Sequence, residues 1–146
     1  MKADIFLMVF LIACIALLSK RFKLLTASGA IAAFFTGIFI WAGFGAKGLV
    51  LLGMFFLTSS LLSKYKRRKK MSLGEVHEKG SARDWAQVAA NGGIAALAGL
   101  ANLLFPHPVW LLLFSVSLAS ANSDTWASEL GVLSEGNPVS IKNFKR

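Results

Sequence analysis

Five long apolar segments, separated by short polar or basic stretches, follow one another along the chain. They occupy residues 5–18, 24–41, 49–62, 85–105 and 109 to about 133. An α-helix needs about 20 predominantly apolar residues to cross the hydrocarbon core of a bilayer. The first and third segments are shorter, so each is either a span extended by snorkelling basic neighbours or a tilted or interfacial helix. The pattern predicts an all-α, polytopic transmembrane helical bundle of about five helices.

The composition agrees with a membrane protein and leaves no room for a separate soluble domain. The chain has 146 residues, of which 55% are hydrophobic, and its mean hydropathy is positive. We therefore treat residues 1–146 as a single integral-membrane domain. The formal net charge is +9, but the basic residues form short clusters between apolar segments rather than one amphipathic face. This distribution argues against a nucleic-acid partner and for a role of the charges in topology.

The first apolar segment is about as long as the core of a signal peptide. The residues before it, "MKAD", carry little net charge, and those after it, "SKRFK", are strongly basic. No small-x-small cleavage site stands between them. We therefore predict that this helix is retained in the mature protein.

The basic residues also predict the orientation of the helices, because cytoplasmic segments carry an excess of Lys and Arg. With the N-terminus outside, fourteen of the sixteen Lys and Arg residues lie on the cytoplasmic side, and Lys2 and Lys47 lie outside. The sequence thus predicts an N-out, C-in multi-pass protein of the cell's inner or plasma membrane, with a basic cytoplasmic loop at residues 64–84. We interpret "KYKRRKK" in this loop as a topological anchor; the alternative is contact with anionic lipid headgroups or nucleotide phosphates.

The stretch "SARDWAQVAANGG", residues 81–93, places polar side chains at the start of the fourth segment. Because a helix turns by about 100° per residue, Arg83, Gln87 and Asn91 share one face, with Asp84 close beside them. In one interpretation, Arg83 and Asp84 cap the helix while the two amides hold neighbouring helices together. In the other, the stripe faces a substrate.

The stretch "NSDTWASELG", residues 122–131, ends the fifth segment with a second polar cluster. Asn122, Thr125 and Glu129 share a face, and Asp124 and Ser128 form an adjacent pair four residues apart. These residues could be a solvated helix end. However, ionisable groups within membranes are costly and usually mark a path for a substrate, ion or proton. On the predicted topology both clusters lie on the cytoplasmic side, where we expect them to face each other.

Phosphoryl transfer is the chemistry that these residue types fit best. The carboxylates of Asp124 and Glu129 supply the hard oxygen ligands that Mg²⁺ accepts, and Arg83 supplies a planar fork suited to phosphate oxygens. We therefore predict Asp124, Glu129 and Arg83 as catalytic residues, the two carboxylates being the metal ligands. The remaining polar residues are predicted to bind substrate or nucleotide: Asn91, Gln87, Asn122, Thr125 and Ser128. The chain has no Walker loop, no "GxSxG" and no His/Cys metal spacing.

The two clusters resemble motifs of a known family. "RDWAQVAANGG", followed some thirty residues later by "SDTWASELGVLS" and then "NPVSI", is similar to the integral-membrane family called domain of unknown function 92, or the transmembrane protein 19 family. The best understood members are plastid phytyl-phosphate kinases. The positions that match the family pattern are Arg83, Gln87, Asn91, Gly92, Asp124, Thr125, Ala127, Ser128, Glu129, Gly131, Ser134 and Pro138.

This resemblance implies an activity. It implies an integral-membrane kinase that transfers a phosphoryl group from a nucleoside triphosphate, CTP or ATP, to an isoprenoid monophosphate such as phytyl or polyprenyl phosphate, with Mg²⁺. Family members continue shortly after the position of Arg146 with a proline, a "GT-x-GG" loop and further helices. The chain is therefore expected to be the N-terminal part of a longer protein, without a loop whose backbone amides could approach phosphates.

Two other classes of function use the same residues. In a transporter or ion-coupled carrier, the polar stripes would line a pathway. In a non-catalytic membrane scaffold, they would only hold helices together. Helix faces rich in Gly and Ala also leave room for a homodimer.

Overall fold

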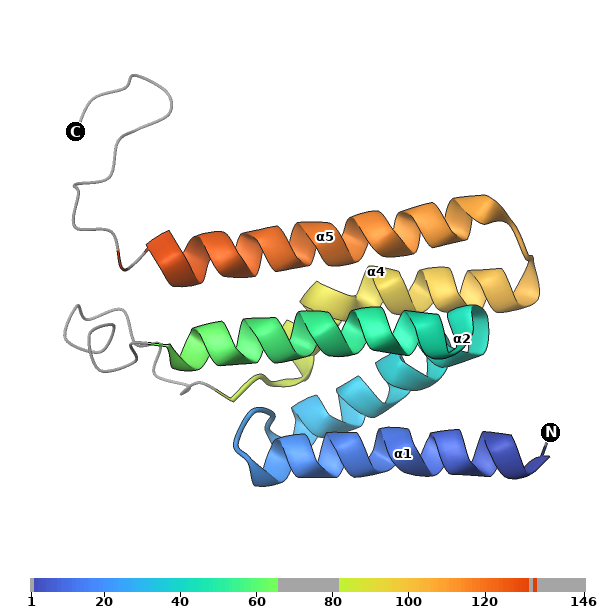
Figure 1. The fold of residues 1–146 in the computed structure, drawn as a ribbon, viewed down its shortest axis with the longest axis horizontal. Helices are drawn as coiled ribbons and strands as arrows, with labels where there is room; N and C mark the ends of the chain where they lie inside the picture. The colour runs from blue at the N-terminus through green and yellow to red at the C-terminus, as the bar shows by residue number, and fades with distance from the viewer. Residues whose placement is uncertain (1, 66–81, 132, 134–146) are drawn as a thin grey trace, which may run out of the picture.

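The computed structural model describes residues 2–65, 82–131 and 133, and in this part of the chain the regular structure is helical. Four helices follow in the order α1 (Lys2–Arg21), α2 (Ala27–Lys64), α4 (Trp85–Leu104) and α5 (Pro108–Gly131), as Figure 1 shows. The all-α prediction is confirmed for these residues. Most of the predicted basic loop, residues 66–81, and the end of the second motif, from residue 134, lie outside the described residues.

The predicted second and third segments correspond to the two halves of α2, two helical stretches that meet at a kink within this element. Gly45 interrupts α2 with φ 63° and ψ −154°, a backbone conformation open almost only to glycine. Both halves of α2 extend from the corner toward the same end of the bundle, so the direction of the chain reverses between them (Figure 1). The apolar pattern breaks at "AGFGAKG", residues 42–48, so hydropathy separates the two halves even though a short corner, and not a long polar loop, joins them.

Side-chain caps stabilise the first turns of α2 and α4, and a backbone bridge joins the segments that precede these helices. The side-chain oxygen of Thr26 accepts a hydrogen bond from the backbone N–H of Gly29 at 3.1 Å, and that of Asp84 accepts one from Gln87 at 3.0 Å. A single parallel bridge joins Leu25 to Arg83. The predicted capping role is therefore confirmed for Asp84.

Helix α4 packs most extensively against α2, because glycines let the two backbones touch. A Cβ at Gly43 would collide with the carbonyl of Gly99, and a Cβ at Gly99 would lie 2.5 Å from the carbonyl oxygen of Phe39. Asn102 then donates a hydrogen bond from Nδ2 to the carbonyl of Gly43 at 2.8 Å. Helices α2 and α4 thus form the most extensive helix–helix contact in the described part of the chain.

The core is small, and most large apolar side chains point outward. The main buried cluster contains Ile40, Phe55, Ala95, Ala98, Phe114 and Leu118. Outward residues such as Phe6 and Phe105 are 76% and 72% exposed, an arrangement that suits lipid rather than water. Among the described helices, Ala27–Lys64 and Trp85–Leu104 are long and apolar enough to cross a membrane.

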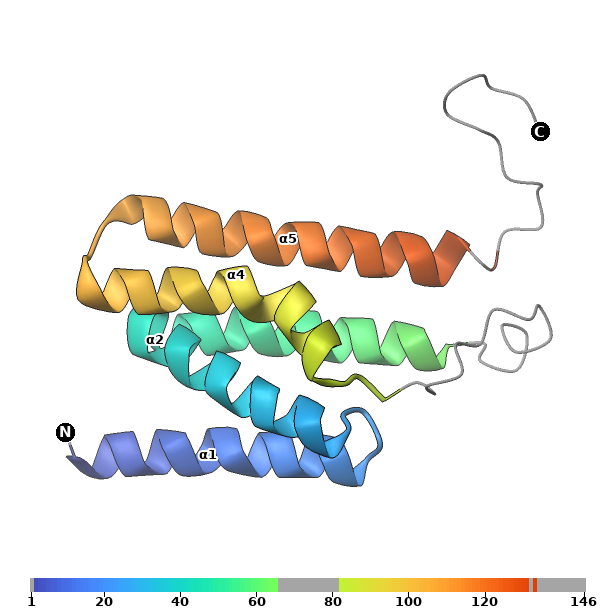
Figure 2. The ribbon, with the colours of Figure 1, turned by 180° about the vertical axis from the view of Figure 1, so that it is seen from behind.

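Different segments of the chain lie at the two ends of the bundle. The C-terminal ends of α1, α2 and α5 lie at one end, and the N-terminus, the corner of α2 and the α4–α5 connection lie at the other (Figures 1 and 2). In that connection, Trp110 Nε1 donates to the carbonyl of Phe105 at 2.8 Å, and Pro108 begins α5 at the position where proline is tolerated best. The predicted functional residues belong to the first end.

Candidate functional site

Arg83 is positioned by its backbone in the short segment before α4. Its N–H donates to the carbonyl of Leu24, and its carbonyl accepts from the N–H of Thr26, each at 3.0 Å. Gly29 makes this approach possible, because a Cβ there would collide with the Arg83 carbonyl. The α1–α2 connection and the first turn of α2 thus fix the point from which the Arg83 side chain extends.

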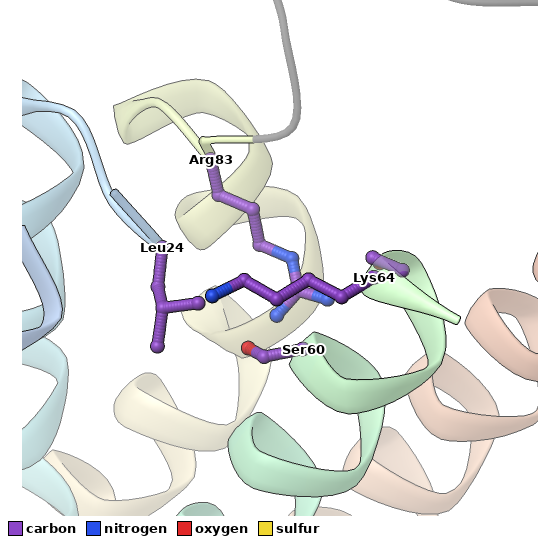
Figure 3. A pocket seen from close by; sticks show the side chains of 5 residues that line it. Leu24, Ser60, Lys64 and Arg83 are labelled. Carbon is purple, nitrogen blue, oxygen red and sulfur yellow. The ribbon is translucent and has the colours of Figure 1, made fainter. Parts of the chain in front are cut away.

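The Arg83 side chain is half-buried and lines a small pocket with Leu24, Ser60, Ser63 and Lys64. Figure 3 shows Arg83 extending from the start of α4 toward Ser60, with the Lys64 side chain crossing the same space from the end of α2. The guanidinium carbon lies 5.8 Å from the centre of the Phe56 ring. The pocket volume is about 10 Å³, which is room for about one water. Two cations and two hydroxyls therefore converge at this end of the bundle.

Glu129 brings a negative charge from α5 to the same place. Ser63 Oγ donates a hydrogen bond to its Oε1 at 2.5 Å. Burial lowers the pKa of Arg83, and the charge of Glu129 opposes that effect. Since a guanidinium stays protonated in proteins, Arg83 keeps its positive charge. The end of α2, the start of α4 and the end of α5 thus form one electrostatic cluster, which we call the Arg83–Glu129 cluster.

The polar residues of α5 divide between two faces. Asn122, Thr125 and Glu129 are half-buried and continue the face that carries buried Phe114 and Leu118. The other two predicted site residues of this helix, Asp124 and Ser128, are exposed. The predicted grouping by helix face is therefore found in the structure, and Glu129, rather than Asp124, lies in the cluster with Arg83.

The polar stripe of α4 divides in a similar way. Gln87 is exposed, whereas Asn91 is half-buried and lines a large cavity together with Arg83. This cavity lies between α1, both halves of α2 and α4. The expected facing of the two stripes is therefore met near Arg83 and Glu129, while Asn91 faces the cavity instead.

Two buried oxygens near this end of the molecule lack hydrogen-bond partners among the described residues, Ser59 Oγ and Asn122 Oδ1. A buried polar group without a partner is costly, so such an atom marks a place for a water or a ligand. The Glu129 carboxylate is a ligand of the kind that Mg²⁺ accepts, and Mg²⁺ is usually held by one or two carboxylates plus phosphates. The described residues contain no group of three or more His, Cys, Asp or Glu that could hold a metal alone. A metal at this place would therefore need further ligands besides the described carboxylates, such as phosphate oxygens.

Sequence reasoning missed the contribution of α2 to this cluster. Lys64 is equally well explained there as a topological anchor, so its charge carries no separate signal. The available signal is "TSSLLSK", residues 58–64, in which Ser59 and Ser63 lie four positions apart at the end of an apolar segment. Polar side chains at that spacing share one helix face and indicate a contact with another polar element.

The comparisons with known proteins agree with the membrane character of the chain. The model of a family described as integral membrane protein DUF92 matches residues 10–146. Protein PGR of Arabidopsis thaliana is 38% identical, with 90% of this chain and 50% of PGR covered. Uncharacterized membrane proteins of Methanocaldococcus jannaschii and Synechocystis are 32% and 33% identical, over 97% and 84% of this chain and 58% and 48% of their own. The chain thus spans about half the length of these relatives, and no solved structure matches it.

Proposed function

The chain belongs to the integral membrane protein family DUF92, the family that its two motifs resemble, and from this premise we propose that it is an isoprenoid-phosphate kinase. In the proposed reaction, a phosphate oxygen of phytyl or polyprenyl monophosphate attacks the γ-phosphorus of CTP or ATP at the cytoplasmic membrane face. The bond from that phosphorus to the β–γ bridging oxygen breaks, and the products are the lipid diphosphate and a nucleoside diphosphate. The observation that carries the proposal is the convergence of Arg83, Lys64 and Glu129 beside an apolar cavity.

The residues of the cluster divide the work as follows. Arg83 and Lys64 bind phosphate oxygens, and Arg83 does so with a fork that its backbone hydrogen bonds hold in place. Ser63 orients the Glu129 carboxylate through its hydrogen bond. When bound, Mg²⁺ would neutralise charge on the transferring group, and the Glu129 carboxylate would be one of its ligands. Asn122, two helical turns away, is proposed to contact substrate or nucleotide.

Asp124 is the second carboxylate that we propose for the metal–nucleotide complex. It is exposed on α5, so it is available to a nucleotide that approaches from outside the helical bundle. Gln87, Thr125 and Ser128 lie along the same helix ends and are proposed to contact substrate or nucleotide. These assignments are tested separately from that of Glu129, since the two carboxylates lie on different faces.

The test is product formation by the natural protein that contains these residues. The purified protein is incubated in detergent with Mg²⁺, CTP or ATP, and geranylgeranyl or phytyl monophosphate, and the diphosphate is sought by mass spectrometry. We expect diphosphate that depends on Mg²⁺ and disappears when the metal is chelated. If folded protein forms no diphosphate with any of these nucleotides and lipids, the kinase proposal is wrong.

A membrane carrier is the second candidate, and the unpartnered oxygens of Ser59 and Asn122 favour it. In a carrier, such buried groups coordinate a substrate that passes between the helices. Transport into liposomes with charge movement and no consumption of nucleotide would identify it. A non-catalytic scaffold would show neither transport nor diphosphate formation, and changing Glu129 to Gln would alter its stability alone.

A further inference from the structure

A cavity of about 320 Å³ lies between α1, the two halves of α2, and α4. Pockets that bind small organic ligands are typically about 300–1,000 Å³ in volume. The walls are almost entirely apolar, and the main contributors are Ile12, Ile15, Leu49, Phe55, Phe56 and Val88. A cavity of this kind suits an apolar chain.

The cavity is accessible from the lipid-facing surface. Leu11 and Val50, which line it from α1 and α2, are 46% and 63% exposed. In a bilayer, side chains with this exposure face lipid, so a lipid chain could enter sideways between the two helices without crossing water. The occupant is therefore expected to come from the membrane.

The polar groups of the cavity wall include one charged group, Arg83. Arg83 also lines the small pocket with Lys64, so the cavity adjoins a place where two positive charges meet. The guanidinium lies against the ring of Phe56, which itself belongs to the apolar wall. A molecule that complements this arrangement has one apolar chain and one anionic head group.

We propose that this cavity binds the isoprenoid chain of the lipid monophosphate and that Arg83 and Lys64 bind its phosphate. The identity of the lipid rests on the proposed kinase function, whereas the chain-plus-anion chemistry rests on the cavity and its charged end. Bound in this way, the phosphate lies next to Glu129, and the chain remains in the apolar interior.

The test compares two glycines in helices with open space around them. Gly53 lines the cavity and Gly93 does not, and an added Cβ meets nothing within 4 Å at either position. Binding of geranylgeranyl monophosphate to the protein in nanodiscs is measured without nucleotide, for Gly53→Phe and for the control Gly93→Phe. We expect the first variant to bind at least about tenfold more weakly, because the ring occupies space needed by several methylene groups, and the control to bind like the wild type.

Three ligands separate the contributions of chain and phosphate. Dimethylallyl monophosphate, which has a short chain, should bind weakly and equally to the wild type and Gly53→Phe. Arg83→Gln should weaken binding of both phosphates. If inorganic phosphate displaces geranylgeranyl monophosphate as effectively as the unlabelled lipid does, the site binds a free anion. If geranylgeraniol displaces it equally well, the site binds any membrane lipid. Either result would overturn the proposal.

The outcome also separates this inference from the kinase proposal. If the natural protein forms diphosphate but Gly53→Phe and Gly93→Phe have the same KM for the lipid, the cavity is not the lipid site and the kinase stands. If selective binding is lost in Gly53→Phe but no nucleotide supports turnover, the cavity stands and the kinase falls.

Discussion

Arg83 is held in position by hydrogen bonds of its backbone, and not by contacts of its side chain. Its N–H and carbonyl bond to the α1–α2 connection, so its position depends on a segment some sixty residues earlier in the chain. Its guanidinium then loses solvent and gains the nearby charge of Glu129. Arg83 belongs to the first motif, but the residues that position it, Leu24 and Thr26, lie outside that motif.

We expect Arg83 and Glu129 to be energetically coupled. A double-mutant cycle of Arg83→Gln and Glu129→Gln should give an interaction of about 0.5–3 kcal/mol in unfolding free energy, because both groups are partly buried and attract each other. The measurement is denaturant-induced unfolding in detergent. A matched cycle that pairs Arg83→Gln with Asp124→Asn should be additive, since Asp124 is exposed. Additivity in both cycles would show that the Arg83–Glu129 cluster is not an energetic unit.

The sequence predicts the residues of the site better than it predicts their partners. The 100° helical rotation separates Asn122, Thr125 and Glu129 from Asp124 and Ser128, and the structure separates them in the same way. Which of the two faces points inward depends on packing against α4 and α2, which the sequence does not reveal. For the same reason, Ser63 and Lys64 could not be recognised as neighbours of Glu129 before the fold was known.

At the scale of elements, glycines decide how closely the helices approach. Hydropathy predicts the helical segments well, because lipid-facing helices are apolar on most of their surface. It separates the two halves of α2, but it does not show that the chain reverses between them within a few residues. Close helix crossings and chain reversals depend on individual glycines, and a hydropathy value averaged over many residues does not reveal them.

Gly99→Ala should destabilise the bundle by about 1–3 kcal/mol, because the new methyl group overlaps the carbonyl of Phe39. The matched control is Gly93→Ala in the same helix, where an added Cβ meets nothing within 4 Å. There, the higher helix propensity of Ala should leave stability unchanged or raise it by up to about 1 kcal/mol. Thermal unfolding in detergent measures both variants. Equal midpoints would mean that α2 and α4 do not cross closely at Gly99.

Gly45→Ala tests the reversal of α2. The space around Gly45 is open, so the cost comes from the backbone alone and should be about 1–3 kcal/mol. Gly53→Ala, in the same helix but with helical backbone, should cost nothing. If the two variants unfold at the same temperature, the chain does not reverse at Gly45 in the conformation described.

At the scale of the whole molecule, the distribution of charge gives the bundle two distinct ends. The basic ends of α1 and α2 lie at the same end as the Arg83–Glu129 cluster, and the corner of α2 lies at the other (Figure 2). The positive-inside rule predicts that the end with the cluster faces the cytoplasm, where nucleotides are found. Site and topology are therefore linked.

Cysteine labelling in intact cells tests this orientation. In a Cys14→Ser background, Lys47→Cys near the corner of α2 should react with a membrane-impermeant maleimide applied from outside. Tyr65→Cys, directly after α2, should react only after the membrane is permeabilised. Both side chains are exposed, so accessibility reports the side of the membrane rather than burial. The reverse pattern would place the cluster outside and contradict the proposed use of a cytoplasmic nucleotide.

The most direct test of the account is the effect of the Glu129 charge on diphosphate formation by the natural protein. Glu129→Gln keeps a group that can bond to Ser63 but removes the charge, so kcat/KM should fall by about a hundredfold or more while the protein stays folded. The control is Asp84→Asn, which removes a carboxylate beside Arg83 but preserves the helix cap, and it should retain wild-type activity. If Glu129→Gln forms diphosphate as fast as Asp84→Asn does, the Arg83–Glu129 cluster is not the site of phosphoryl transfer.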